Sequence, residues 1–349
     1  MAEYLCLNGE SIGPDTLEQW RCGRCGREAE LGDFLAEWYS EADFVTLHTS
    51  GSTSKPQRIQ AAKEAMRASA RLSCEYFGII PGTRALLCLP LRYIAGKMMV
   101  VRALVSGCEL LLGEPSSRPL ATWHEPIDFA PLVPMQAAAT LQEPGGLAQL
   151  AQVKTILLGG SFIDPALTEA LQAVPSRIFA SYGMTETLSH IALRHVNGSL
   201  RSEWYTPLRG ISLSLSADGT LQIEAPHIGI SRLTTNDLAE IAADGRFRIL
   251  GRRDSVINSG GVKVQAEEVE QTLTAATGLP LLVVPAPHAI LGQCVALLWE
   301  GALNKEPVLM KAIDSLPAYH RPRIIRHIDA LPRTATGKLS RAQAAAMLR

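Results

Sequence analysis

Long apolar runs are missing from this chain of 349 residues. No stretch approaches the roughly 20 consecutive apolar residues that a membrane-spanning helix needs. The segment Met1 to Cys6 has neither the basic region nor the apolar core of a secretory signal. We therefore expect no membrane insertion.

A surplus of charge of either sign is missing as well. Lysine and arginine total 33 and aspartate and glutamate total 34, which gives a formal net charge of −1. Such a balance offers no electrostatic footprint for nucleic acid or for an anionic membrane, so neither is an expected partner. Any anionic ligand must be held by local groups.

Cysteines are few and their number is odd. The seven of them are spread along the whole chain, unlike the paired framework of a small secreted domain. Cys22 and Cys25 form a single C-x-x-C. A zinc site would need two further ligands, and of the two remaining interpretations, a redox pair and ordinary thiols, we favour ordinary thiols. A reducing cytoplasm is the expected compartment.

What the chain does have is an alternation of strand-like and helix-like segments. Hydrophobic residues make up 47%, enough for a large core, and the length suggests two units at about 150 residues per domain. The alternation predicts an α/β fold with helices covering a sheet. The predicted strands are 44–49, 85–89, 155–158 and 177–180, and the predicted helices are 61–77 and 165–173.

Beyond about residue 205 the pattern changes. Segments 211–216 and 220–224 alternate apolar and polar residues around Asp218-Gly219, which predicts a β-hairpin in a small β-rich section. Further strands are predicted at 245–251, 281–284 and 295–299, with a helix at the C-terminus. We place a boundary near 251–254, which gives a large N-terminal domain, 1–252, and a small mobile α+β domain, 253–349.

The sharpest motif follows the predicted strand at 44–49. Its hydroxyl groups, glycine and lysine could wrap phosphate oxygens, although the spacing is not that of a Walker A loop. The residues are Thr49, Ser50, Gly51, Ser52, Thr53 and Lys55.

Four weaker motifs follow in order. Segment 181–187 offers Tyr182 for stacking a base and Glu186, beside Thr185, for holding Mg²⁺, while 158–161 would let backbone approach a flat ligand. Asp237 could accept ribose hydroxyls, segment 251–264 leads into an acidic helix start, and Lys338 lies on a glycine-containing loop near the end. Each of them alone is compatible with an ordinary turn.

In this order, the five segments resemble those of the adenylate-forming superfamily, which includes acyl- and aryl-CoA ligases, luciferase and peptide-synthetase adenylation domains. The resemblance covers 46–341 and implies two half-reactions. A carboxylate first attacks the α-phosphate of ATP, with Mg²⁺, to give an acyl-adenylate and pyrophosphate. The thiol of CoA then displaces AMP to give a thioester.

The resemblance also implies roles for individual residues. The loop at 49–55 would bind pyrophosphate, Lys338 would bridge carboxylate and α-phosphate, and Glu186 would hold Mg²⁺ beside Thr185. Other matching positions would bind the nucleotide: Gly160, Ser161, Ser181, Tyr182, Gly183, Asp237 and Arg252. Asp254 would be the hinge of the small domain, and Gly260 with Gly261 would line the thiol channel.

The sequence departs from the family at several positions. Ser54 replaces a glycine, Gln57 and Arg58 replace Lys-Gly, and Asn236 replaces the glycine before the ribose aspartate. None of these changes removes a charged catalytic group, so we expect activity to survive. Only 48 residues precede the phosphate loop, which leaves open how the first sheet is completed and favours a homodimer.

Segments 89–97 and 181–189 resemble those of the short o-succinylbenzoate–CoA ligases of menaquinone biosynthesis. Their substrate carries a second, aromatic carboxylate, which needs a cation or several donors if it is buried. Tyr93, Lys97 and His190 are the residues expected to contact the acyl group, with Lys97 as the preferred cation and Arg92 and Arg194 as further candidates. The alternatives are a ligase for another aryl or short acyl carboxylate and a non-catalytic nucleotide-binding member.

Overall fold

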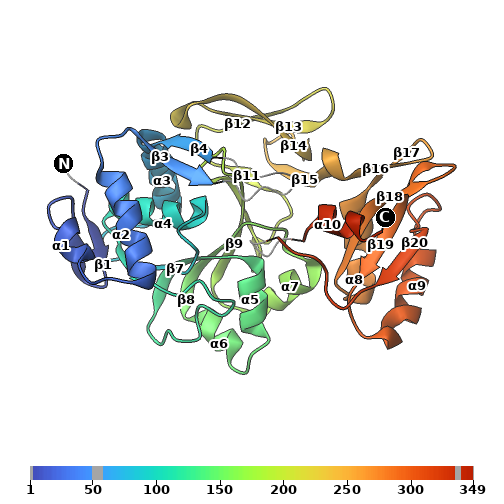
Figure 1. Ribbon diagram of the computed structural model, residues 1–349, viewed down its shortest axis with the longest axis horizontal. Coiled ribbons are helices and arrows are strands. Elements are labelled where there is room, and N and C mark those ends of the chain that lie inside the picture. The colour runs from blue at the N-terminus through green and yellow to red at the C-terminus, as the bar shows by residue number, and fades with distance from the viewer. Residues whose placement is uncertain (1–2, 49–57, 335–338, 349) are drawn as a thin grey trace.

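The computed structural model describes residues 3–48, 58–334 and 339–348. Its centre is a nine-stranded sheet with the order β11-β10-β9-β8-β7-β5-β6-β1-β2 (Figure 1). Neighbours from β1 through β6, β5, β7 and β8 to β9 run parallel. The strands are β1 (Leu5–Leu7), β2 (Glu10–Ile12), β5 (Arg84–Leu87), β6 (Glu109–Leu112), β7 (Ile127–Leu132), β8 (Val153–Leu158), β9 (Arg177–Gly183), β10 (His190–His195) and β11 (Thr206–Pro207).

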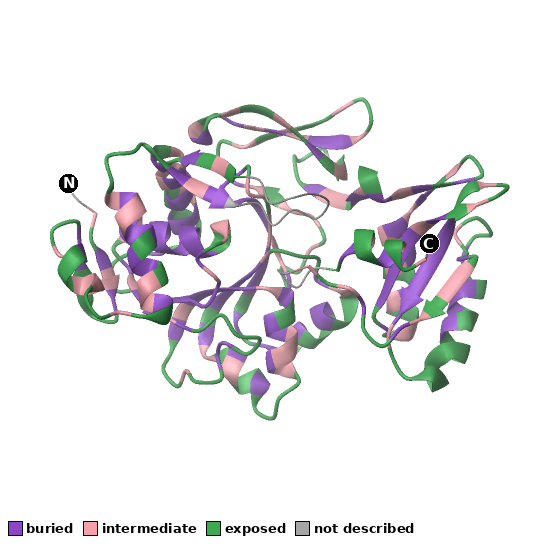
Figure 2. Cartoon of the chain, viewed as in Figure 1, coloured by how far each residue is buried: buried purple, intermediate pink, exposed green. Residues whose placement is uncertain are grey.

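Helices cover both faces of this sheet, as the sequence alternation predicts. One buried cluster joins α2, α3 and α4 to one face, and a second joins α5, α6 and α7 to the other. The parallel strands are therefore buried on both sides (Figure 2). The helices are α1 (Leu17–Arg21), α2 (Gly26–Tyr39), α3 (Lys63–Phe77), α4 (Ile94–Ser106), α5 (Pro134–Leu141), α6 (Gly146–Ala151) and α7 (Pro165–Ala170).

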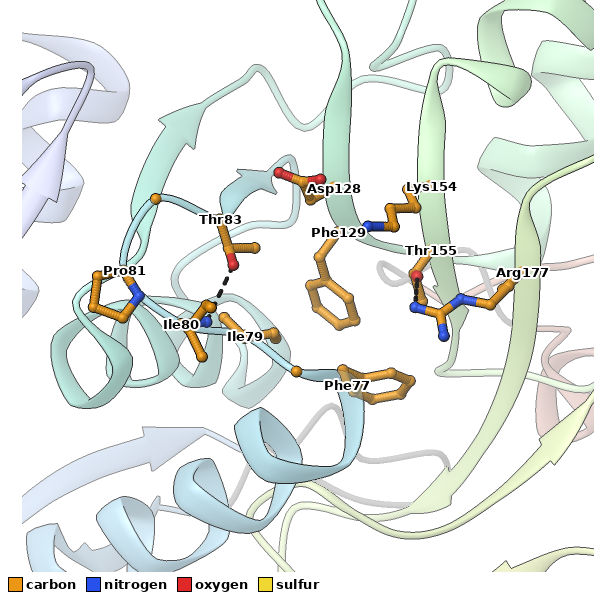
Figure 3. A pocket seen from close by; sticks show the side chains of 12 residues that line it. Phe77, Ile79, Ile80, Pro81, Thr83, Asp128, Phe129, Lys154, Thr155 and Arg177 are labelled. Carbon is orange, nitrogen blue, oxygen red and sulfur yellow. Dashed lines mark hydrogen bonds between the residues drawn. The ribbon is translucent and has the colours of Figure 1, made fainter.

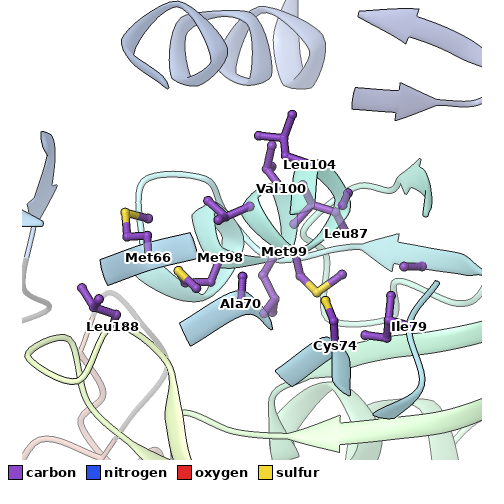
Figure 4. Close-up of a cluster of buried hydrophobic side chains, with 14 of the residues drawn as sticks. Met66, Ala70, Cys74, Ile79, Leu87, Met98, Met99, Val100, Leu104 and Leu188 are labelled. Atoms are coloured by element: carbon purple, nitrogen blue, oxygen red, sulfur yellow. The ribbon is translucent and has the colours of Figure 1, made fainter. Parts of the chain in front are cut away.

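Helix α4 is buried over most of its length. The side chains from Met98 to Val101 are buried. Met98 and Met99 lie toward α3, near Met66 and Ala70, while Val100 points away from α3 (Figure 4). Gly96 lets the start of the helix approach the preceding loop, since a Cβ there would lie 2.4 Å from the Pro90 carbonyl oxygen. Gly107, with φ 68°, ends α4 in the left-handed conformation that suits glycine. Any charged residue on α4 is thus held inside the protein.

The N-terminal part differs from the sequence prediction at one element and answers the open question of how the first sheet is completed. Residues 61–62 belong to β4 (Arg58–Ala62) rather than to the helix, because they pair with β3 (Phe44–His48) in an antiparallel ribbon. The sheet is completed by β1 and β2, which lie beyond β6 at its edge. Arg27 of α2 fastens this part by donating to the carbonyl oxygens of Gly113, Leu87 and Leu89. The short N-terminal region therefore supplies the edge of the sheet itself.

The predicted β-rich section is a four-stranded antiparallel sheet. Its strands are β12 (Ser212–Leu215), β13 (Thr220–Ala225), β14 (Ile230–Ile241) and β15 (Phe247–Arg252). The hairpin turns at Asp218-Gly219, where Gly219 has φ 76°. Strands β14 and β15 place Asp237 directly opposite Arg252.

The last part of the described chain has its own five-stranded sheet and two hydrophobic clusters, which contain no residue before Ile257. This segregation supports our proposal of separate domains at 1–252 and 253–349. The elements are β16 (Val256–Ser259), β17 (Val262–Gln265), α8 (Ala266–Thr277), β18 (Leu281–His288), β19 (Gly292–Trp299), α9 (Glu306–Asp314), β20 (Ile324–His327) and α10 (Arg341–Ala346). No helix in the described ranges is long and apolar enough to cross a bilayer.

Candidate active site

Several predicted site residues gather at the carboxyl edge of the parallel strands, where α/β sheets commonly bind ligands. Gly160 and Ser161 follow β8, and the segment 181–187 runs from the end of β9. Ser181 donates to the Leu158 carbonyl oxygen at 3.0 Å, which joins the two segments. A Cβ on Gly159 would lie 2.6 Å from Ser181 Oγ, so the glycine is needed for this approach.

The loop after β9 is held by one buried threonine. The Thr187 hydroxyl lies within hydrogen-bonding distance of the Met184 and Ser189 carbonyl oxygens and can donate to either of them. It also accepts from the Met184 amide at 2.9 Å. Gly183 packs against the far side of this loop, since a Cβ there would lie 2.4 Å from Ser189 O. The loop leaves Glu186 exposed, with Thr185 half-buried beside it.

Glu186 makes no ion pair or hydrogen bond with another described residue, so its carboxylate is free to receive a cation. In the ranges that the structure describes, no group of three or more His, Cys, Asp or Glu side chains could hold a metal ion. A magnesium ion commonly takes one or two carboxylates and completes its shell with phosphate oxygens and water. The exposed carboxylate of Glu186 fits that pattern.

A network of four side chains joins β9 to the β14–β15 pair. Tyr182 Oη donates to Asp237 Oδ2 at 2.6 Å, and Arg252 Nη1 donates to Asp237 Oδ1 at 3.3 Å. Arg252 also forms a bidentate pair with Asp254, at 2.9 and 2.8 Å. This pair lowers the pKa of Asp254 and raises that of Arg252. A carboxylate can accept about four hydrogen bonds, so Asp237 keeps room for hydroxyls of a ligand.

The Tyr182 ring is fixed by its neighbours. It contacts Phe247 at 5.2 Å and Tyr205 at 6.0 Å between ring centroids. Burial, followed by the negative charge of Asp237, raises the pKa of Tyr182, so its hydroxyl stays protonated as a donor. The structure thus brings together Ser181, Tyr182, Asp237 and Arg252, all of which the sequence assigns to the nucleotide site.

Other predicted site residues are placed elsewhere or are not described. Thr49, Ser50, Gly51, Ser52, Thr53, Lys55 and Lys338 lie outside the described residues. Gly260 and Gly261 form the turn between β16 and β17, away from β9 in Figure 1. Asp254 follows β15, beside the proposed domain boundary. The assigned roles of all these residues stay predictions.

The residues predicted to contact the acyl group do not form one cluster. Tyr93 precedes α4, and its ring lies 4.8 Å from the Arg92 guanidinium. Lys97 points to α2 and β3 instead, where its ammonium donates to Glu37 Oε2 at 3.2 Å and to the Thr46 carbonyl oxygen at 3.1 Å. Lys97 therefore has a carboxylate partner within the chain.

Sequence reasoning missed a buried cation on α4, five residues after Lys97. Arg102 is 3% exposed, and Nε donates to Ser73 Oγ at 2.8 Å while Nη2 donates to Ser189 Oγ. None of the described carboxylates pairs with it. Burial lowers the pKa of Arg102 to about 10, a value at which the guanidinium is still charged near neutrality. The signal in the sequence is a single arginine inside an apolar helix.

His190 adjoins this arginine. Ser189 Oγ lies 3.3 Å from His190 Nδ1 and accepts from Arg102, so its own proton is free to bond Nδ1. Nε2 of His190 is then an N–H donor, and among the described residues it is the one buried side-chain nitrogen or oxygen without a partner. Burial, followed by the Arg102 charge, lowers the pKa of His190 well below its usual value. Arg102 and His190 together form a buried, donor-rich cluster in which no described carboxylate balances the Arg102 charge and His190 Nε2 has no described partner.

Comparison with known proteins identifies the family. The model of the AMP-binding enzyme family matches residues 15–218. The chain belongs to that family. A solved structure from Dyadobacter fermentans, described as an acyl-CoA synthetase (AMP-forming)/AMP-acid ligase II-like protein, is 34% identical, with a TM-score of 0.65 over 95% of this chain and 97% of the other.

Two further relatives show how far the likeness extends. The 2-succinylbenzoate–CoA ligase of Lactococcus lactis is 24% identical, over 88% of this chain and 71% of the relative. The o-succinylbenzoate CoA synthetase of Bacillus subtilis, solved with ATP and magnesium, is 24% identical with a TM-score of 0.69 over 85% of this chain and 69% of that one, and supports the fold. The predicted superfamily and α/β fold are confirmed, and the chain is an acid–CoA ligase of the adenylate-forming type.

Proposed function

We propose that the protein is an ATP-dependent o-succinylbenzoate–CoA ligase. The observation that carries this proposal is the Arg102 guanidinium, which is buried without a described carboxylate partner. An unpaired buried charge is costly, and a carboxylate on the substrate would compensate it. o-Succinylbenzoate has two carboxylates, so one can react while the other is bound.

The neighbours of Arg102 support the same assignment. Ser189 and His190 directly follow the loop that holds Glu186, and Gly183 packs on Ser189 O. The donor-rich cluster of Arg102 and His190 thereby adjoins the predicted nucleotide site. Lys97 is the weaker candidate, because Glu37 already neutralises it. We accordingly assign the second carboxylate to Arg102, with the His190 Nε2–H as a further donor.

The chemistry follows from the predicted roles. The succinyl carboxylate attacks the α-phosphorus of ATP, the bond to pyrophosphate breaks, and an acyl-adenylate forms. The sulfur of CoA then attacks the acyl carbon, AMP leaves, and the thiol proton goes to solvent. Lys338 supplies a positive charge between the reacting carboxylate and phosphate in the first step.

The predicted roles also assign residues to the nucleotide. Asp237 accepts from the ribose hydroxyls, Tyr182 offers its ring to adenine, and the loop 49–55 binds the leaving pyrophosphate. Mg²⁺, held by Glu186, would offset the charge of the phosphates when it is bound. Arg252 orients Asp237 by donating to its second oxygen.

The test is one incubation of the purified protein with Mg²⁺-ATP, CoA and o-succinylbenzoate, read by mass spectrometry. We expect AMP and o-succinylbenzoyl-CoA in equal amounts. AMP without the thioester would mean that the acceptor is not CoA. The absence of both products while ATP still binds would mean that the acid is a different one or that the protein is not catalytic.

A further inference from the structure

A pocket lies at the opposite edge of the main sheet from the candidate active site. It has a volume of about 370 Å³ and is lined by residues near the amino ends of β7, β8 and β9 and by the segment 77–83, which joins α3 to β5 (Figure 3). Because these strands are parallel, their amino ends meet at one edge and their carboxyl ends at the other. The pocket is therefore separate from the nucleotide site.

One side of this amino-edge pocket is apolar and aromatic. The rings of Phe77 and Phe129 have centroids 5.0 Å apart, and Phe179 packs edge-on against Phe77 at 5.3 Å between centroids. Ile79, Ile80 and Pro81 continue this wall, and the side chain of Ile80 is 62% exposed. A flat apolar ligand could cover surface that is now in water.

The other side is positively charged. Lys154 and Arg177 line the pocket, and both side chains point toward the phenyl rings in Figure 3. Arg177 donates to Thr155 Oγ1 at 2.8 Å, and none of the described carboxylates forms an ion pair with either cation. The acid in the lining, Asp128, accepts from the Arg84 amide at 2.9 Å. The pocket thus holds two cations against one carboxylate.

We propose that the amino-edge pocket binds a small aromatic carboxylate. The guanidinium and ammonium would hold the carboxylate, and the phenyl wall would hold the ring. The volume lies at the small end of the range of small-molecule sites, which fits a ligand of one or two rings. This proposal is independent of the acid that the active site activates.

The test is a titration with 2-naphthoate, in the absence of ATP and CoA. It follows the NMR signal of the Ile80 δ1 methyl group. Isoleucine methyl groups are labelled in the full chain, and the Ile80 signal is assigned with I80V. We expect the Ile80 signal to shift with 2-naphthoate until it saturates. The Kd from the same titration with the neutral 2-naphthamide should be about tenfold higher. An unmoved Ile80 signal, or equal responses to acid and amide, would overturn the proposal.

Charge variants complete the design. K154Q/R177Q should weaken the Ile80 response about tenfold or more, and K154Q alone should weaken it severalfold without disturbing the fold, because Lys154 is exposed. R232Q/K311Q removes the same charge from exposed positions on β14 and α9 and should leave the response unchanged. An unchanged response in K154Q/R177Q, or an equal loss in the control, would contradict the assignment.

Discussion

The substitution R102Q separates recognition of the second carboxylate from the chemistry of the first. Charge-assisted hydrogen bonds contribute about 1.5–3 kcal/mol, which corresponds to about 10- to 150-fold in kcat/KM. We expect kcat/KM for o-succinylbenzoate to fall by that factor. For 3-benzoylpropionate, which lacks the aromatic carboxylate, it should change by less than about threefold.

The assay is thioester formation with each acid at saturating ATP and CoA. The informative quantity is the ratio of the two kcat/KM values, because a general loss of folded protein lowers both equally. The matched control is R209Q, because Arg209 is exposed and is paired with Glu75. Equal losses for the two acids in R102Q would refute a role for Arg102 in binding the second carboxylate.

Stability gives an independent reading of the same residue. Burying a charge without a charged partner is costly, and even whole buried ion pairs can be replaced by apolar side chains with no loss or with a gain of about 1–4 kcal/mol. R102M should therefore unfold at an unchanged or higher urea concentration in the absence of substrate, although Ser73 and Ser189 lose a donor. A loss of about 3–5 kcal/mol would instead indicate that Arg102 is structural.

Four further predictions concern the rest of the site. K338A should abolish acyl-adenylate formation while thioester formation from supplied adenylate persists; equal losses in the two assays would contradict the role of Lys338. D237N should raise the KM for ATP about 10- to 100-fold, against no change in D218N, which is exposed. G183A should cost about 1–3 kcal/mol in urea unfolding, since its Cβ would meet backbone at 2.4 Å; a neutral result would show that the loop can move. The pKa of His190 is lowered in the folded protein, so on acidification the unfolded chain binds a proton at this histidine before the folded chain does. The stability that neutral His190 contributes is therefore present above about pH 6.5 and is lost below it, by up to about 1.4 kcal/mol per pH unit. H190N should flatten the urea-midpoint profile between pH 7 and 5, and an unchanged slope would contradict this.

Much of the fold could be predicted because local pattern and tertiary structure agree there. Apolar runs predict the strands β8 and β9, and a proline at the first helical position predicts the start of α7. The turn residues Asp218-Gly219 predict the hairpin. The extent of α3 could not be predicted. Ala61 and Ala62 favour a helix, but pairing with β3 makes them a strand. Long-range pairing there overrides intrinsic propensity.

The candidate site shows the same division. The nucleotide residues stand next to strand ends, so the positions of Ser181 and Tyr182 could be predicted from the order of the elements. The partner of Lys97 could not be, because Glu37 lies 60 residues away in the sequence. Arg102 escaped prediction because a lone arginine in an apolar helix gives no indication of which groups surround it.

The central claim is that this ligase selects an acid with a second carboxylate. The most direct measurement gives the wild-type protein equal concentrations of o-succinylbenzoate and 3-benzoylpropionate with limiting ATP, and compares the two thioesters by mass spectrometry. We predict that o-succinylbenzoyl-CoA exceeds the other product by about tenfold or more. Equal amounts, or an excess of 3-benzoylpropionyl-CoA, would contradict the claim.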